Sequence, residues 1–174
     1  IYDNSFDRDN EELIRGYKLL GKSDQISNEY KCTLAIGDNK SRKENFIKYK
    51  EQILINNLRH QNSYIEDQVT LGISNQIFYN SYINSGSEIG DNNILNSGCT
   101  IEHEVKIGSH NHISIGSVLC GRATIGNNCF IGAGSIIIDK INICNNVIIG
   151  SGSIVTKDIS EPGTYVGKPI RKIK

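Results

Sequence analysis

The sequence predicts an all-β solenoid, a parallel β-helix, preceded by a partial α/β segment. From Ile65 to Val155 every sixth residue is aliphatic, giving sixteen positions in one phase without an insertion. Neither the period of a helix nor the alternation of a hairpin strand produces this register. Six residues are the repeat of a parallel β-helix, in which each hexapeptide forms one short side of a coil. The sixteen positions are Ile65, Leu71, Ile77, Ile83, Ile89, Leu95, Ile101, Ile107, Ile113, Leu119, Ile125, Ile131, Ile137, Ile143, Ile149 and Val155.

A second column of mostly small residues follows four positions after the aliphatic ones. One large and one small side chain per side would fill the narrow interior of a coil. The small residues include Ser81, Ser87, Cys99, Ser117, Ala123, Cys129, Ser135 and Ser153.

A period of eighteen residues lies over the period of six. It spaces Gly98, Gly116, Gly134 and Gly152, and it also spaces Asn92, His110, Asn128 and Asn146. Glycine and asparagine tolerate the left-handed backbone angles that sharp corners need. Eighteen residues are three hexapeptides, so we expect a triangular prism of about five coils, with these two columns at two of its corners.

The third corner has no such turn residues. It stacks the pairs Ser85-Gly86, His103-Glu104, Gly121-Arg122 and Asp139-Lys140. This irregularity is the first indication of a functional site.

Composition excludes several classes of protein. The 174 residues hold 19 Lys and Arg against 19 Asp and Glu, so no global field indicates a nucleic-acid partner. Five cysteines without a metal-ligand spacing fit a reducing, cytoplasmic location. We find no signal peptide and no apolar run long enough to span a membrane, so no membrane insertion is expected. A start at Ile1 without Met suggests a chain trimmed at its N-terminus.

Two domains are expected, residues 1–53 and residues 54–174. The first is charged and lacks the six-residue period. Tyr30 to Ile36 reads as a buried strand, and Lys40 to Ile55 reads as a helix after a Gly-Asp-Asn turn, which together form one unit of a parallel α/β sheet. Asp7 to Leu20 is expected to hold a shorter helix. We interpret residues 1–53 as the later part of a Rossmann-like, nucleotide-sugar-binding domain that lacks its first strand and Gly-rich turn.

Residues that precede each aliphatic position point outward, because neighbouring side chains on a strand alternate faces. Two of the three outward columns are largely apolar, and such faces are not left in water. They predict self-association, and a triangular prism with two apolar faces suits a cyclic trimer. The columns are Tyr82, Thr100, Val118, Ile136 and Ile154, and Gln76, Ile94, His112, Phe130 and Ile148.

His103 and Glu104 are the strongest candidates for catalysis. Histidine titrates near neutral pH, and an adjacent carboxylate can fix its tautomer and raise its basicity. That combination suits a general base. Gly121, one coil further, leaves room beside His103 in which an arm of a ligand could run. His110, in a column of asparagines, is expected to be a structural corner residue.

These residues resemble a known family. The runs Ile101-Glu102-His103-Glu104, Asn111-His112-Ile113-Ser114 and Phe130-Ile131-Gly132-Ala133-Gly134-Ser135 are similar to the left-handed β-helix (hexapeptide-repeat) sugar acetyltransferases. Val166-Gly167-Lys168-Pro169 also matches. Within that group the similarity is greatest to the family of sialic acid O-acetyltransferases and of bacillosamine and perosamine N-acetyltransferases. It covers roughly residues 54 to 174, and residues 33–45 resemble the end of the family's nucleotide-sugar domain.

The resemblance implies a left-handed helix, an exception to the usual crossover rule, and a homotrimer with acetyl-CoA in the groove between subunits. It implies that His103 deprotonates the amine or hydroxyl of the sugar and that Glu104 supports it. His112 would contact the thioester region of acetyl-CoA from the neighbouring chain, and Gly121, Ala133 and Ser151 would line the cofactor. The cations after the last coil, Lys168 above all, would hold the CoA phosphates.

The implied reaction is acetyl-CoA-dependent acetylation of an amino sugar, with the amine of a nucleotide-linked 4-amino-4,6-dideoxy sugar favoured and O-acetylation of a sialic acid type of sugar as the alternative. No metal is expected. The family's Gly-His pair in an N-terminal Gly-rich turn is missing, which leaves the acceptor open. Two other classes also stay open at this point. One is a zinc hydratase of the carbonic anhydrase type, which needs three converging histidines. The other is an inactive trimeric scaffold, which would not bind acetyl-CoA.

Overall fold

A computed structural model of the chain describes residues 1–3, 13–14, 16–27 and 29–174. It divides into two compact units, Ile1–Cys32 and Thr33–Lys174. The first unit holds a two-stranded antiparallel pair, β1 (Leu13–Ile14) and β2 (Tyr17–Lys18), and a 3₁₀ turn, η1 (Ser23–Gln25). A helix had been expected over 7–20. Residues 4–12 and 15 lie outside the described part, and the strands occupy the rest of that range.

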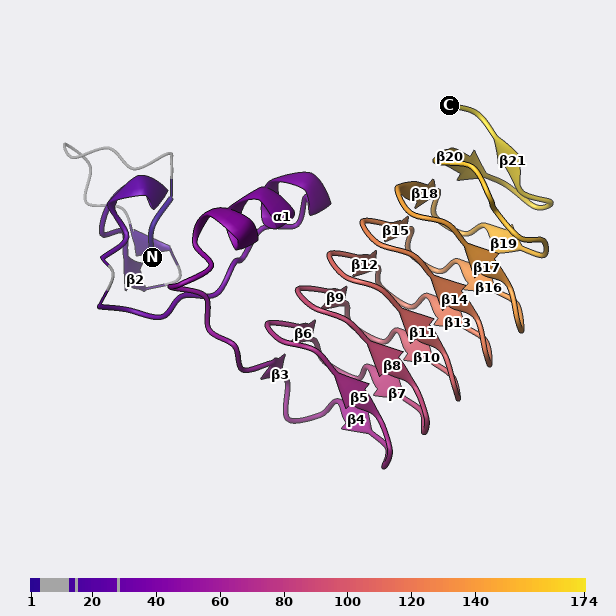
Figure 1. Cartoon of the computed structure of the whole chain (residues 1–174), viewed down its shortest axis with the longest axis horizontal. Helices are drawn as coiled ribbons and strands as arrows, with labels where there is room; N and C mark the ends of the chain where they lie inside the picture. The colour runs from indigo at the N-terminus through magenta and orange to yellow at the C-terminus, as the bar shows by residue number, and fades with distance from the viewer. Residues whose placement is uncertain (4–12, 15, 28) are drawn as a thin grey trace. The chain divides into compact units, whose positions relative to one another are not determined.

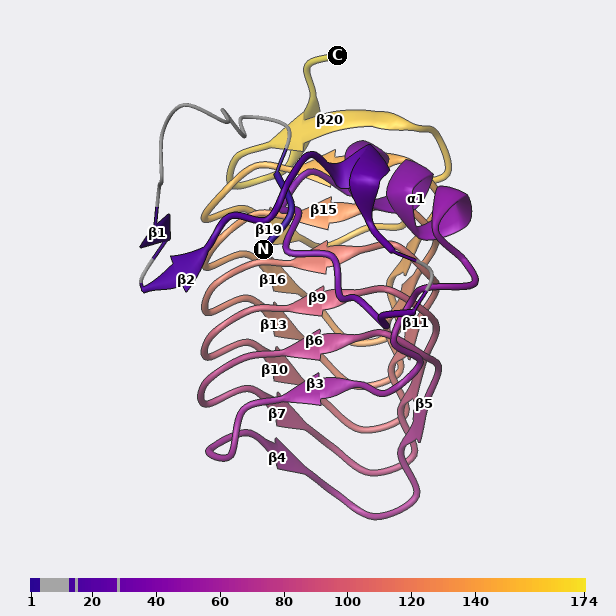
Figure 2. The ribbon, with the colours of Figure 1, turned by 90° about the vertical axis from the view of Figure 1, so that its left-hand side faces the viewer.

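The second unit is a left-handed parallel β-helix with one α-helix, as predicted (Figures 1 and 2). Three parallel sheets form its faces. We number them in the order in which the chain reaches them. Helix α1 belongs to the same compact unit as the coils, because the boundary between the units lies at residues 32 and 33. The domain division between residues 53 and 54 that the sequence suggests stays a prediction.

The first face consists of β3 (Leu58–Arg59), β6 (Gln76–Ile77), β9 (Ile94–Leu95), β12 (His112–Ile113), β15 (Phe130–Ile131), β18 (Val147–Ile149) and β20 (Gly163–Val166), with β21 (Arg171–Lys172) antiparallel at its end. The second face consists of β4 (Tyr64–Ile65), β7 (Tyr82–Ile83), β10 (Thr100–Ile101), β13 (Val118–Leu119), β16 (Ile136–Ile137) and β19 (Ile154–Val155). The third face consists of β5 (Thr70–Leu71), β8 (Glu88–Ile89), β11 (Lys106–Ile107), β14 (Thr124–Ile125) and β17 (Asn142–Ile143).

The six-residue pattern is confirmed position by position. Each of the sixteen aliphatic residues is the last residue of a strand, and strands pair with a shift of eighteen, as Ile101 pairs with Leu119. The small residues of the second column are also buried; Cys99, Ser117 and Ala123, for example, are fully covered. Large and small side chains together form one continuous core along the axis of the solenoid.

The solenoid extends beyond the pattern at both ends. At its start Arg59 takes the place of an aliphatic residue and pairs with Ile77. At its end Ile159 bridges to Ile143, and Tyr165 pairs with Ile149. Ile159 follows Val155 by four positions instead of six, so a two-residue deletion breaks the sequence pattern while the coil itself continues.

All three corners use the left-handed backbone conformation. The glycine corner, between the first and second faces, is built by Asn80, Gly98, Gly116, Gly134 and Gly152. The asparagine corner, between the third and first faces, is built by Ser74, Asn92, His110, Asn128 and Asn146. The charged corner, between the second and third faces, is built by Gln68, Gly86, Glu104, Arg122 and Lys140.

Helix α1 (Asn39–Lys48) follows Gly37, with the Asp38 carboxylate accepting a hydrogen bond from the Ser41 N–H at its N-terminus. It is shorter than the expected range of 40–55. Residues 33–37 form no strand, although a buried strand over Tyr30–Ile36 had been expected. These residues lie instead on the outer side of the first face, where the side-chain amide of Gln76 donates to the Leu34 carbonyl at 2.8 Å.

Candidate active site

The charged corner brings His103 and Glu104 into contact. The His103 Nδ1 lies 3.1 Å from the Glu104 Oε2. Because a carboxylate only accepts, this contact places the imidazole proton on Nδ1 and leaves the lone pair on Nε2. The two side chains are 44% and 57% exposed, so the pair lies at the surface of the solenoid.

Gly121 has a different local role from the one expected. A methyl group at Gly121 would lie 2.5 Å from the His103 Nε2 and 2.7 Å from its Cε1. The space that the sequence suggested for an arm of the ligand is therefore filled by the His103 ring. Gly121 is the residue that allows the imidazole to lie flat against the next coil, with Nε2 above the backbone.

A chain of ion pairs continues along the charged corner. The Arg122 Nε lies 3.1 Å from the Glu104 Oε2, and its Nη1 lies 3.7 Å from the Asp139 Oδ1. The hydrogen bond from His103 and the charge of Arg122 hold the pKa of Glu104 below its usual value of 4.5. Glu104 is thus a carboxylate at neutral pH and can orient the imidazole.

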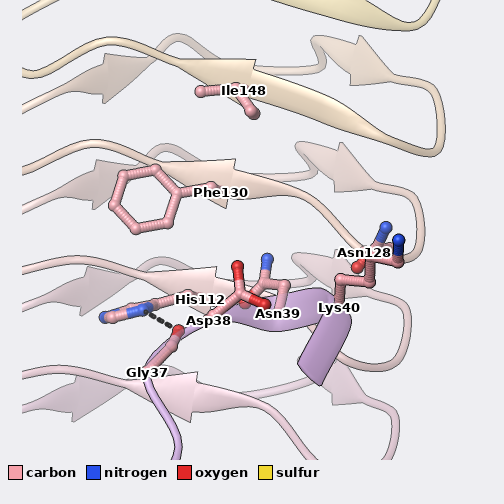
Figure 3. A pocket seen from close by; sticks show the side chains of 8 residues that line it. All are labelled: Gly37, Asp38, Asn39, Lys40, His112, Asn128, Phe130 and Ile148. Atoms are coloured by element: carbon pink, nitrogen blue, oxygen red, sulfur yellow. Dashed lines mark hydrogen bonds between the residues drawn. The ribbon is translucent and has the colours of Figure 1, made fainter. Parts of the chain in front are cut away.

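A cavity of about 530 Å³ lies on the first face, beside the N-terminus of α1 (Figure 3). Its floor is formed by strand residues of successive coils, and its side by the segment that leads into the helix. The lining residues are Gly37, Asp38, Asn39, Lys40, His112, Asn128, Phe130 and Ile148.

His112 is held at both ring nitrogens. Its Nδ1 donates to the Gly37 carbonyl at 3.3 Å, and its Nε2 lies 3.1 Å from the Asn96 Nδ2. The Asn96 Oδ1 accepts from the Ser97 N–H, so its amide nitrogen is the donor toward His112. Burial lowers the pKa of His112, the Gly37 hydrogen bond raises it, and the Arg42 charge lowers it. His112 is therefore a neutral imidazole of defined tautomer.

The structure separates His103 from His112 within one chain. The charged corner joins the second and third faces, whereas His112 lies on the first face, on the opposite side of the coil. Ala133 and Ser151 stack one coil apart beside the glycine corner, where the Gly152 N–H donates to the Ala133 carbonyl. Lys168 is exposed in the turn between β20 and β21. Of the predicted site residues, only His103, Glu104 and Gly121 therefore come together in one chain.

His110 occupies the asparagine corner with a φ of 64°, as the sequence predicted. Its ring stacks edge-on against Phe46 at 5.4 Å between centroids, and its Nδ1 lies 2.9 Å from the Asn92 Nδ2. The three histidines of the coils thus lie on two different corners and one face. Among the residues with described coordinates, no group of three or more His, Cys, Asp or Glu side chains forms a metal-binding cluster.

Three contacts at these sites were missed by the sequence analysis. Arg122 pairs with Glu104, Asn96 with His112, and Arg42 with the backbone of two coils. The eighteen-residue spacing of Glu104 and Arg122 was a signal for the first pair. Asn96 and His112 are sixteen residues apart and fall outside the eighteen-residue columns. The Arg42 contacts depend on where the chain before the solenoid lies, which no periodicity encodes.

Comparison with known proteins agrees with this architecture. Residues 104–139 and 122–157 match the family described as bacterial transferase hexapeptide (six repeats). A search of curated protein sequences finds no match.

Two solved structures illustrate the similarity of the fold. The acetyltransferase domain of PglB from Neisseria gonorrhoeae FA1090 superposes with a TM-score of 0.89 at 23% identity, over 97% of this chain and 84% of that one. PerB from Caulobacter crescentus, in complex with CoA and GDP-perosamine, superposes with a TM-score of 0.87 at 25% identity, over 91% of this chain and 80% of that one. Both agree with the resemblance found in the sequence.

Proposed function

We propose that the protein is an acetyl-CoA-dependent acetyltransferase that acylates the amine of a nucleotide-linked amino sugar, with a 4-amino-4,6-dideoxy sugar favoured. The observation that carries the proposal is the pairing of His103 with Glu104. It places a half-exposed imidazole, with Nδ1 turned to the carboxylate, on a turn that has no structural need for histidine. Support for the acceptor comes from PerB, whose structure holds GDP-perosamine.

The pair has the geometry of a general base. An amine attacks the thioester carbonyl carbon only through its lone pair, so the proton it sheds must go to a positioned acceptor as the C–N bond forms. The His103 Nε2 is that acceptor, and Glu104 stabilises the imidazolium that results. The C–S bond then breaks, and the thiolate of CoA leaves and takes up a proton.

Acetyl-CoA is the co-substrate, and no protein-bound metal takes part. The PglB domain is also known in complex with acetyl coenzyme A. In this chain Gly121, Ala133 and Ser151 present backbone at two corners that border the second face, and Lys168 offers an exposed cation beyond the last coil. CoA would supply the activated acetyl group, and Lys168 would pair with its phosphates.

A homotrimer completes the site. Since His103 and His112 lie on opposite sides of one chain, a ligand that touches both must lie between two copies. Apolar outward residues on two faces supply the contacts, with Ile136 37% and Ile148 47% exposed in the single chain. Ile94, expected to join them, is only 4% exposed and is already buried within its own chain. The interface therefore uses the later coils.

The alternative acceptor is a sugar hydroxyl, as in sialic acid O-acetylation, because the same base could deprotonate it.

None of the described helices is long and apolar enough to cross a membrane. A cytoplasmic location remains a prediction from the cysteine pattern.

The deciding experiment measures release of the CoA thiol with a panel of nucleotide-linked sugars that carry a 4-amino, a 3-amino or only hydroxyl groups. We expect turnover with a 4-amino sugar and none with its 4-hydroxyl counterpart. Turnover confined to hydroxyl acceptors would assign O-acetylation instead. Acetyl-CoA binding without turnover on any acceptor, or no binding, would overturn the proposal.

A further inference from the structure

Arg42 is the only residue of helix α1 that is buried, and its side chain is fully covered. Its guanidinium reaches six acceptors at 2.7–3.2 Å: the carbonyls of Ile36, Gly37, Asn92, His110 and Asn111 and the Oδ1 of Asn39. Burial lowers its pKa to about 10, which still leaves it charged at neutral pH. The helix has no buried apolar stripe. Arg42 fastens it to the solenoid together with the Asn39 side chain, which donates to the Cys129 carbonyl at 2.8 Å, and Phe46, which packs edge-on against His110.

The acceptors of Arg42 belong to two parts of the chain. Asn92, His110 and Asn111 belong to the asparagine corner and the residues beside it, in two successive coils. Ile36, Gly37 and Asn39 belong to the segment that leads into α1. Arg42 therefore ties this segment to the coils at the edge of the first face.

The Gly37 carbonyl connects Arg42 to His112. It accepts from the Arg42 Nη1 at 3.2 Å and from the His112 Nδ1 at 3.3 Å. An acceptor fixed at this place requires the proton of His112 on Nδ1, and Asn96 then meets the lone pair on Nε2. The same segment supplies the wall of the cavity that His112 lines, including Asp38 and Lys40.

We propose that Arg42 is a positioning residue that fixes the tautomer of His112 and that holds the wall of the cavity on the first face. The proposal deepens the function argued above, and its kinetic consequence rests on that function. Arg42 touches neither His103 nor the charged corner in any described contact. It acts through the Gly37 carbonyl.

Lysine cannot replace arginine in this role. The guanidinium has five N–H donors in a rigid plane and serves six acceptors in different directions, whereas an ammonium group has three. Lysine at this position would keep the charge but leave buried carbonyls unpaired, which is unfavourable in the interior of a protein. The segment 36–40 would then move away from the solenoid and the Gly37 carbonyl would move with it.

The charged groups around His112 are few, which makes its titration a clean reporter. Arg42 lies on α1, Asp38 and Lys40 lie at the start of the helix, and the neighbours within the sheet are the neutral Asn96 and Phe130. The chain has four histidines, so labelled imidazole resonances are few enough to assign with His112→Gln.

The test is an NMR titration of His112 in the full chain, comparing Arg42→Lys and Arg42→Gln with the wild type. We expect the pKa of His112 to be higher in Arg42→Gln than in Arg42→Lys, because only the glutamine variant removes the repelling charge of Arg42. The imidazole nitrogen shifts should change from a pure Nδ1–H tautomer to a mixture. Lys43→Gln is the matched control, because it removes one positive charge from the next residue and leaves the Gly37 hydrogen bonds intact.

The kinetic arm uses the acceptor identified above. At a saturating concentration of this acceptor, Arg42→Lys should lower kcat/KM for acetyl-CoA about 10-fold, mainly through KM, because His112 and the cavity wall that would contact the thioester region are displaced. Far-ultraviolet circular dichroism confirms that the coils remain folded. An unchanged His112 pKa and tautomer in folded Arg42→Lys and Arg42→Gln would overturn the proposal, whether or not the acetyl transfer itself is found.

Discussion

The charged corner and the asparagine corner share the same backbone conformation but differ in how well their residues suit it. Both place one residue per coil in the left-handed region, with φ of 58° at Glu104 and 54° at Asn92. Asparagine takes this conformation readily, whereas Glu, Arg and Lys do so at a cost of roughly 1–2 kcal/mol each. At the asparagine corner the residues suit the turn. At the charged corner the chain tolerates strained turns and gains a histidine–carboxylate pair and its ion-pair network. Strain of this kind is typical of functional sites.

The test with the largest expected effect replaces the histidine at each corner. His103→Ala should lower kcat about 10²–10⁴-fold, the usual contribution of a positioned base. His110→Asn should leave kcat near that of the wild type, because asparagine already forms this turn in three other coils. Steady-state kinetics with acetyl-CoA and the acceptor measures both, and light scattering checks assembly. Loss of turnover in His110→Asn but not in His103→Ala would reverse the assignment of the two corners.

The next largest effect is expected at Gly121. Gly121→Ala places a methyl group within 2.7 Å of two atoms of the His103 ring and should push the imidazole off the coil. A displacement of about 1 Å can cost on the order of 10²-fold in rate.

The matched control is the same substitution in a His103→Ala background. With the ring removed, Gly121→Ala should have little further effect on kcat or on the melting temperature. Equal effects in both backgrounds would mean that the methyl group disturbs the coil rather than the histidine.

Glu104→Gln should have a smaller effect on rate than His103→Ala, because the imidazole remains and loses only its carboxylate partner. Since the pKa of Glu104 is depressed, its contribution to stability is fully present above its usual value of 4.5 and is lost as the pH falls through the lower folded value. The difference in unfolding free energy between wild type and Glu104→Gln should therefore be flat above about pH 5 and shrink below pH 4.5. Urea unfolding across pH 3–7 measures it. A difference that grows toward acid pH would contradict the ion-pair geometry.

The smallest effect tests the strain itself. Lys140 has a φ of 62° at the charged corner and pairs only with Asp139 among the described ion pairs. Lys140→Asn should raise the unfolding free energy by about 1 kcal/mol or less, because asparagine takes the left-handed conformation more readily. Thermal unfolding should show a small increase in melting temperature. A decrease would show that the Lys140 side chain contributes more than its backbone strain costs.

The sequence alone determined the solenoid, its register and its three corners. This was possible because every interior position and every turn is specified within a few residues of chain and repeated in each coil. Because the repeat is local, His103 and Glu104 could be recognised as candidates. They stand at a corner where the coils share no column of Gly or Asn turn residues, so this corner departs from the repeat. The two-residue deletion before Ile159 hid the last coil, because a periodic pattern ends where the spacing changes.

Only the tertiary structure decided what lies on the outside of the first face. The outward column from Gln76 to Ile148 reads as one apolar surface, yet its early part is buried within the single chain, with Ile94 only 4% exposed, and its later part borders the cavity. A helix whose one buried side chain is an arginine has no periodic signature, because the six acceptors of that arginine come from residues up to 69 positions away. Contacts between distant, non-repeating segments depend on the final arrangement of the backbone in space. The pattern therefore placed His112 on its face, but its contact with the Gly37 carbonyl was decided by the fold.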